Sequence, residues 1–346
     1  VVGRAAGGLA IAGIITCLFW GAVSGSGPAT TAAVGLTIIP AMIKQNYDKN
    51  FSATTIAAAS GLAIIIPPSI AFIIYGNVTG VSVGALFLGG IIPGIFIGFS
   101  LMVAAYFISR ERGFRGIRER GSGKEIFHTL KDAIWALLAP IIILGGIYAG
   151  IATPTEAAVF AVFYSVFVGL FVYRTLNFKN LYEALVGTVV TSSVVMFVVT
   201  FATQFSIAAA VLGVIDTIAE TIIQIAKTPI IILLMANVAI IIAGMFLDAI
   251  SITYVFMPIF MPILVYYEID PLFFGVLFVI ALSIGQITPP VAVNLYVAAN
   301  LVNSTMDKLT KEIWPYLIAA IVALVILTFL PQLSLWIPVS AGLYFP

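Results

Sequence analysis

The stretch GAVSGSGPATTAAVG, residues 21–35, interrupts a long apolar run with serines, glycines and a proline. These residues weaken a helix, because proline removes an amide donor and glycine permits unusual backbone angles. A segment that only crosses lipid gains nothing from such a break, since backbone groups without partners are costly there. The stretch therefore predicts a backbone that does something besides span a membrane.

The composition indicates an integral membrane protein. The 346 residues are 62% hydrophobic and 8% charged, which is far from the values of soluble domains. Apolar segments of about 20 residues, long enough to span a bilayer, follow one another closely. A single cysteine, Cys17, and a single histidine, His128, exclude a disulfide framework and argue against a Cys/His metal site. No feature predicts a nucleic-acid partner.

Basic residues set the expected orientation. The net charge is only +1, yet Lys and Arg crowd into residues 109–131. By the positive-inside rule, we expect this loop in the cytoplasm. The residues are Arg110, Arg112, Arg115, Arg118, Arg120, Lys124 and Lys131.

The sequence repeats itself at a spacing of 222 residues. Four of the five prolines before residue 124 meet another proline at that distance. Proline makes up about 5% of average sequences, so these matches indicate an internal duplication. The matched pairs are Pro40 with Pro262, Pro67 with Pro289, Pro68 with Pro290, and Pro93 with Pro315.

The charges indicate that the two copies are inverted. A hairpin over 5–45 lies between the basic residues Arg4 and Lys44, whereas a hairpin over 229–266 ends at the acidic YYEIDP. We expect five crossings between the hairpins, and this odd number places them on opposite faces. Inverted repeats with broken helices are typical of secondary transporters.

The fold class we expect is an all-α polytopic membrane protein of the elevator type, resembling ion transporters. Each inverted repeat would hold a re-entrant helical hairpin and a broken transmembrane helix. The expected segments are a first repeat over 1–108 (hairpin 5–45, broken helix 51–76, helix 83–108), a basic cytoplasmic loop over 109–131, scaffold or arm helices over 132–226, a second repeat over 227–332 (hairpin 229–266, broken helix 272–298, helix 312–332) and a C-terminal tail over 333–346.

Four breaks predict ion sites at the centre of the membrane. They are VSGSGPAT and IIIPPSI in the first copy, and FLDAISI and GQITPPV in the second. Freed carbonyls and helix C-termini can bind a cation, while helix N-termini can face an anion. Oxygen ligands with little negative charge favour sodium over a divalent ion. Hydroxyl oxygens beside the breaks come from Ser24, Ser26, Thr30, Ser69 and Thr288.

Asp248 is the only ionisable side chain between Lys227 and Glu268. A carboxylate inside the membrane is a functional hypothesis by default, although it can also only hydrogen-bond a neighbouring helix. At the 222-residue spacing its counterpart is Ser26, so both hairpin tips carry a side-chain oxygen. We expect Ser251, Gln286 and Asn294 to complete a polar cluster with it.

Most of the proposed site contains no basic side chain. Residues 50–109 and 228–307 lack Lys and Arg. An anion bound there would be neutralised by bound cations and helix N-termini, which would make the two ligands bind cooperatively. This is a physical route to symport.

Several long motifs resemble one known family. GAVSGSGPATTAAVGLTIIPAMIKQNYDKNF, AIIIPPSIAFIIYGNVTG, LFLGGIIPGI, GIATPTEAAVFAV, GMFLDAIS and TPPVAVNLYVA occur in order along nearly the whole chain. Together they are similar to the large membrane subunit of tripartite ATP-independent periplasmic (TRAP) transporters.

The resemblance implies a sodium-driven elevator transporter in the bacterial inner membrane. It would take up an organic acid, such as a dicarboxylate, sialic acid or a similar carboxylate. A periplasmic binding protein would deliver this acid, and a small membrane subunit, separate or fused, would accompany the chain in the lipid bilayer. The resemblance also implies that scaffold helices precede Val1 in the full protein.

The resemblance also implies site residues, motif by motif. It places Na+ at Ser24, Gly25, Ser26, Ile66, Pro67 and Ser69 in the first copy, and at Asp248, Ser251, Gly285, Gln286, Thr288 and Pro289 in the second. Substrate would lie between the tips, at Ser26, Gly27, Pro28, Ala29, Thr30, Pro68, Pro290 and Asn294.

Other interpretations remain for these features. The chain could be a carboxylate/sodium symporter that needs no binding protein, or a passive anion channel with carbonyls along its pore. A serine hydrolase would need a general base near Ser26, and the only histidine lies in the basic loop. Glu156 is interpreted as a first-turn residue of a helix that Thr153 or Thr155 caps. We therefore predict a transporter and no enzyme.

Overall fold

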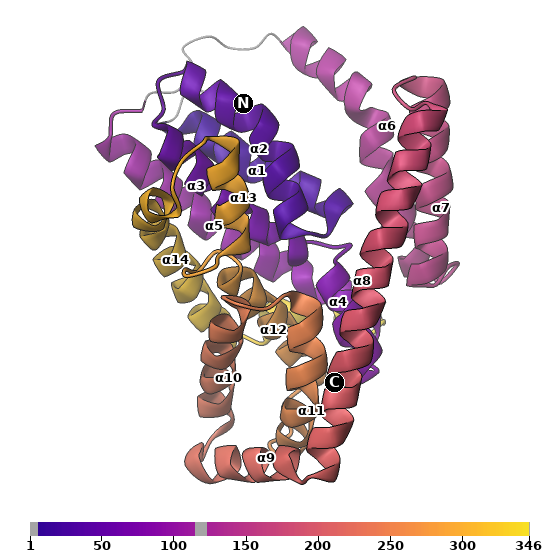
Figure 1. The fold of residues 1–346 in the computed structure, drawn as a ribbon, viewed down its shortest axis with the longest axis vertical. Helices are drawn as coiled ribbons and strands as arrows, with labels where there is room; N and C mark the ends of the chain where they lie inside the picture. The colour runs from indigo at the N-terminus through magenta and orange to yellow at the C-terminus, as the bar shows by residue number, and fades with distance from the viewer. Residues whose placement is uncertain (1–5, 115–122, 346) are drawn as a thin grey trace.

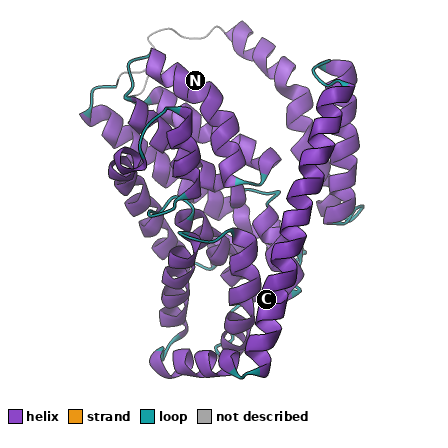
Figure 2. Ribbon diagram, in the orientation of Figure 1, coloured by secondary structure: helices purple, strands orange, loops and turns teal. Residues whose placement is uncertain are grey.

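The computed structural model describes residues 6–114 and 123–345, and gives side chains for 6–114 and 133–345. Within these ranges all regular elements are helices, joined by loops without strands (Figure 2). Most of the basic loop, with Arg115, Arg118 and Arg120, lies outside the described residues, as does Arg4. The elements are α1 Gly8–Ser24, α2 Gly27–Lys44, α3 Lys49–Ser60, η1 Gly61–Ile64, α4 Ile70–Thr79, α5 Val83–Glu111, α6 Gly123–Tyr148, α7 Pro154–Phe167, η2 Val168–Val172, α8 Phe178–Val211, α9 Val214–Ile225, α10 Pro229–Gly244, α11 Ala249–Tyr266, α12 Pro271–Gly285, α13 Val293–Leu301, α14 Met306–Thr328 and α15 Gln332–Ser340.

Five helices in the described part of the chain are long and apolar enough to cross a membrane. They are Val83–Glu111, Pro154–Val172, Phe178–Val211, Ala249–Tyr266 and Met306–Thr328. Shorter apolar helices, including α1, α4, α10 and α12, lie between them. The all-helical fold that the sequence predicts is confirmed.

In the first half, local sequence explains each helix end. α1 stops because Gly25 adopts a left-handed conformation with φ 61 and donates its N–H to the Gly21 carbonyl. Ser26 is extended, and α2 then begins with Pro28 in its first turn. α3 begins at the Asp48 cap, tightens into η1 and ends before the two prolines, after which Ser69 caps α4.

The second half has the same order of elements. α10 and α11 are separated by a short tip at residues 245–248, and Asp248 caps α11. α12 begins at the Asp270 cap and ends before Pro289 and Pro290, and α13 follows. Both bounds of α11 lie 222 residues after those of α2, and α12 begins 222 residues after α3.

The two interrupted helices, α3–α4 and α12–α13, run in opposite directions. At one end, the Ser304 hydroxyl after α13 donates a hydrogen bond to Oδ1 of Asn50 in α3 at 2.6 Å. At the other end, the Tyr75 hydroxyl in α4 donates to the Pro271 carbonyl at the start of α12 at 2.7 Å. Each interrupted helix thus begins where the other one ends. In Figure 1, α1 and α2 lie in the upper half of the molecule and α10 and α11 in the lower half.

The two interrupted helices meet at the centre of the core. The Ser283 hydroxyl donates to the Gly61 carbonyl at 2.7 Å. A Cβ atom on Gly61 would lie 2.5 Å from that hydroxyl oxygen, so only glycine leaves room for the contact. All residues of α12 after Pro271 are buried, as are Phe51 to Ser60 of α3.

Helices α6 to α9 form an arm beside this core. α8 has 34 residues, which gives it a length of about 50 Å, and most of its apolar side chains are exposed (Figure 1). At the start of α7, Thr153 and Glu156 form a capping box. Hydrogen bonds from Thr153 lower the pKa of Glu156. The interpretation of Glu156 as a first-turn residue capped by Thr153 is confirmed.

The segment expected as a C-terminal tail contains α15. Beyond this helix, the Tyr344 hydroxyl donates to the second carboxylate oxygen of Asp270 at 2.9 Å, while the first oxygen caps α12. Burial and the bond to Asp270 raise the pKa of Tyr344 to about 12, so the hydroxyl remains a donor at neutral pH. Pure sequence pattern does not reveal this contact, because it joins residues 74 positions apart.

Candidate functional site

The tip of the first hairpin lies against the first break. A Cβ atom on Gly25 would lie 3.2 Å from the Pro68 carbonyl oxygen and 3.4 Å from the Ile70 nitrogen. Among the described residues, no donor reaches the carbonyls of residues 65–68. The structure therefore brings the Gly25 backbone beside a run of carbonyl oxygens without protein partners.

The three serines of the first predicted cation site differ in what they bond. The Ser24 hydroxyl donates to the Ser26 carbonyl at 3.3 Å. The Ser69 hydroxyl donates to the Ile64 carbonyl at 2.5 Å and accepts from the Phe72 N–H at 3.4 Å. The Ser26 hydroxyl is half-buried and has no partner among the described residues. Ser26 is therefore the serine whose side chain is available to a ligand.

The second hairpin meets the second break through two glycines. A Cβ atom on Gly285 would lie 2.7 Å from the Gly244 Cα atom, so the backbones of α10 and α12 are in contact. The Thr288 hydroxyl donates to the Ile284 carbonyl at 2.6 Å. Within the described ranges, the carbonyls of residues 287–291 accept no hydrogen bond from the protein. This break also leaves oxygens without protein partners.

Asp248 and Ser251 form a helix cap. Oδ1 of the exposed Asp248 accepts from the Ser251 N–H at 2.6 Å. The second carboxylate oxygen of Asp248 has no partner in the part of the chain that the structure describes. One oxygen thus holds the start of α11, and the other is available to a cation.

A buried polar cluster joins the first tip to the second break. A Cβ atom on Gly27 would lie 2.6 Å from Oε1 of Gln286 and 2.9 Å from both amide atoms of Asn294. Gln286 is 9% exposed, and Asn294 and Thr30 are fully buried. Oε1 of Gln286, both amide atoms of Asn294 and the Thr30 hydroxyl oxygen have no hydrogen-bond partner. Buried polar atoms without partners are costly, so this cluster marks a place where a ligand is missing.

Two helix N-termini point an uncapped end toward this cluster. Ser26 before α2 and Ala292 before α13 make no side-chain cap. The first amide groups of each helix therefore have no intrahelical partner, and they carry partial positive charge. Gly27 belongs to the first turn of α2 and Asn294 to that of α13. The cluster can therefore hold an anionic group without a basic side chain.

The structure regroups the residues predicted from sequence. Gln286, predicted for a cation, and Asn294, predicted for substrate, both adjoin Gly27. The sequence analysis missed Gly61 and Ser283, although the 222-residue spacing pairs these two positions and could have identified their contact. Across the described residues, no group of three His, Cys, Asp or Glu side chains could hold a metal ion.

Comparison with known proteins identifies the family. Residues 1–333 match the family model described as Tripartite ATP-independent periplasmic transporter, DctM component. This chain belongs to the DctM family. Its DctM-family relatives are transporter permease components, so the prediction that the chain is not an enzyme is confirmed. With its apolar helices, membership of this family makes the chain a multi-pass membrane protein.

Named DctM-family relatives differ in the ligand that their names state. The chain is 41% identical over 337 residues to the isethionate TRAP transporter permease protein DctMQ of Oleidesulfovibrio alaskensis, covering 97% of this chain and 53% of the relative. It is 37% identical to the C4-dicarboxylate TRAP transporter large permease protein DctM of Pseudomonas aeruginosa, covering 99% and 80%. It is 34% identical to the sialic acid TRAP transporter large permease protein SiaM of Vibrio cholerae, covering 98% and 79%.

Proposed function

We propose that this chain carries a small organic acid across the bacterial inner membrane, driven by a sodium gradient. The observation that carries the proposal is the buried cluster of Gln286, Asn294 and Thr30 around Gly27. Its polar atoms have no protein partners, and two helix N-termini adjoin it. A carboxylate would satisfy the amide and hydroxyl donors and face the positive ends of both helices.

Sodium supplies the positive charge that the protein does not. Residues 50–109 and 228–307 contain no Lys or Arg, so bound cations would neutralise the acid. One ion would be held by the carbonyls around Ile66 and Pro67 with Gly25 and Ser26. A second would be held by the carbonyls around Thr288 and Pro289 with the free oxygen of Asp248. Carbonyl, hydroxyl and single carboxylate oxygens suit a hard monovalent cation.

The two halves of the chain are proposed to be inverted repeats of one unit. Support comes from the antiparallel course of the interrupted helices, from helix bounds that recur after 222 residues and from the contact between Gly61 and Ser283. Two oppositely oriented hairpins around one site allow access from either face in turn, as an elevator mechanism requires. The arm helices α6 to α8 would belong to the part that stays fixed.

The substrate class is proposed to be an organic acid with one or two anionic groups. The names of three relatives state isethionate, C4-dicarboxylate and sialic acid, which share an anionic head group. The cluster around Gly27 would bind that head group. A periplasmic binding protein is proposed to deliver the acid, and a small membrane subunit to complete the transporter, as the TRAP family name and the name DctMQ suggest.

Reconstitution into proteoliposomes tests the proposal. Uptake of labelled isethionate, a C4-dicarboxylate and sialic acid is measured with and without an inward sodium gradient, and with and without the binding protein. We expect uptake of at least one acid that requires both. Uptake that needs no sodium gradient and does not saturate would instead indicate a channel. Sodium-dependent uptake without a binding protein would identify an independent symporter.

A further inference from the structure

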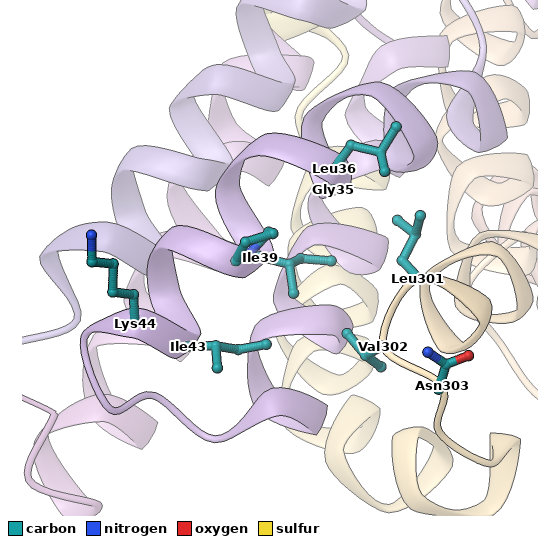
Figure 3. A pocket seen from close by; sticks show the side chains of 9 residues that line it. Gly35, Leu36, Ile39, Ile43, Lys44, Leu301, Val302 and Asn303 are labelled. Atoms are coloured by element: carbon teal, nitrogen blue, oxygen red, sulfur yellow. The ribbon is translucent and has the colours of Figure 1, made fainter.

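A groove of about 460 Å³ opens between the second half of α2 and the end of α13. Its size is in the range of small-molecule sites, about 300–1,000 Å³. It begins about two helical turns beyond the Gly27 cluster, so it is separate from the candidate transport site. The lining residues are Gly35, Leu36, Ile39, Pro40, Ile43, Lys44, Leu301, Val302 and Asn303 (Figure 3).

The walls of this groove are apolar and open to the surroundings. Leu36 is 67% exposed and Ile43 is 41% exposed, whereas Ile39 forms the buried floor. In Figure 3, the side chains of Ile43 and Val302 point toward each other across the groove. Apolar walls in a membrane protein are better filled by hydrocarbon than by water. A lipid chain is therefore the occupant that suits the walls.

One end of the groove is polar and positively charged. Lys44 lies in the last turn of α2, is exposed and makes no ion pair within the described ranges. Asn303 closes α13 with φ 47, and its exposed side-chain amide has no partner in the described part of the chain. Pro40 has no N–H, so the Leu36 carbonyl lacks its usual helical donor. An amphipathic ligand with an anionic head would satisfy these groups.

This end lies on the basic face of the protein. The hydrogen bond from Ser304 to Asn50 places the loop after α13 beside the start of α3 at Lys49. Lys308 follows in the first turn of α14. Anionic lipids are attracted to basic cytoplasmic surfaces, and long Lys side chains reach the head-group layer. No acidic side chain lines the groove to oppose such a lipid.

We propose that this groove binds one anionic phospholipid. An acyl chain lies along Leu36, Ile39 and Ile43, and the phosphate contacts Lys44 and the Asn303 amide. A soluble anion would use only the polar end and would leave the apolar walls uncovered. The site does not depend on what the protein transports, so it can be tested apart from transport.

Lipid retention tests the proposal. The full-length protein is placed in nanodiscs of equal phosphatidylglycerol and phosphatidylcholine, extracted in mild detergent and analysed by native mass spectrometry for bound lipid. We expect wild-type protein to retain phosphatidylglycerol preferentially. Lys44→Ala should lower this retention by about fivefold. Lys49→Ala is the matched control, because Lys49 is exposed on the same face but does not line the groove, and it should retain lipid like wild type.

A second variant tests the acyl-chain part of the site. Leu36→Trp places a larger side chain at an exposed position, so it should fill the groove without disturbing the core, and bound phosphatidylglycerol should be lost. Equal retention of the two lipids by wild type would overturn the proposal. So would equal effects of Lys44→Ala and Lys49→Ala, full retention by Leu36→Trp, or displacement of the lipid by inorganic phosphate, which would indicate a site for soluble anions.

Discussion

The Ser283 hydroxyl donates a hydrogen bond to the Gly61 carbonyl at 2.7 Å, and the two residues are 222 positions apart. This is the spacing at which the prolines of the two halves coincide. Equivalent positions of two units touch each other only at the two-fold axis that relates the units. The contact therefore supports a pseudo-two-fold axis through the crossing of the two interrupted helices.

Gly61→Ala should destabilise this crossing. The new Cβ atom would lie 2.5 Å from the Ser283 hydroxyl oxygen and 3.3 Å from its carbonyl oxygen. Overpacking of this kind costs about 1–3 kcal/mol. Thermal unfolding in detergent measures the effect. Gly145→Ala is the control, since nothing lies within 4 Å of its Cβ position in α6, and it should be neutral or slightly stabilising. Equal melting temperatures for the two variants would contradict the packing described for Gly61.

Asn294→Leu should separate stability from function. Both amide atoms of Asn294 are buried without partners, so an apolar side chain of similar size removes an unsatisfied group and should leave the unfolding temperature equal or higher. Substrate uptake should be lost, because the proposed anion loses an amide donor. A less stable Asn294→Leu variant that still transports would refute the assignment.

Asn237→Leu is the matched control for Asn294→Leu. The Asn237 amide is also buried, but it donates to the Thr328 hydroxyl at 3.0 Å. Removing one partner of a buried hydrogen bond costs about 1–3 kcal/mol. This variant should therefore unfold at a lower temperature, and the contrast between the two asparagines distinguishes a ligand site from a structural bond.

Asp248→Asn should distinguish a helix cap from a cation ligand. Asparagine caps helices about as well as aspartate, so the unfolding temperature should stay unchanged. The lost charge should raise the sodium concentration needed for half-maximal uptake. Asp248→Ala should also lose the cap to the Ser251 N–H, at a cost of about 1 kcal/mol. Identical sodium activation in wild type and Asp248→Asn would remove Asp248 from the proposed ion site.

Single cysteines in the two hairpin tips should be labelled from opposite faces. Ser26→Cys and Leu247→Cys are suitable, because Ser26 is half-buried and Leu247 is 45% exposed, while the native Cys17 is fully buried and should not react. An impermeant maleimide added to right-side-out and inside-out vesicles measures access. Labelling of both tips only from the same side in all conditions would be incompatible with alternating access.

Helix order and helix ends could be predicted well from sequence, because they depend on local chemistry. Proline, glycine and capping residues act within a few positions, and the expected hairpin at 229–266 holds α10 and α11 with those outer bounds. Long-range contacts were less accessible. The position of Gln286 and Asn294 beside Gly27 depends on how α2 packs against α13, which periodicity does not encode.

The predicted polar cluster around Asp248 illustrates the same limit. Sequence alone placed Asp248, Ser251, Gln286 and Asn294 together, because all four are polar residues near breaks of the second half. In the structure, Asp248 is exposed and bonds to the Ser251 N–H, while the two buried amides adjoin the opposite hairpin. Membrane depth predicts that a polar residue is functional, but it does not say which neighbour the residue has.

Sodium-dependent binding to the purified protein tests the central claim most directly. The binding of a labelled organic acid is measured in sodium and in choline buffer, for wild type and for Gly27→Ala, whose Cβ atom would lie 2.6 Å from Oε1 of Gln286. The account predicts saturable binding by wild type in sodium only, and none by Gly27→Ala. Equal affinity in choline buffer, or wild-type binding by Gly27→Ala, would contradict it.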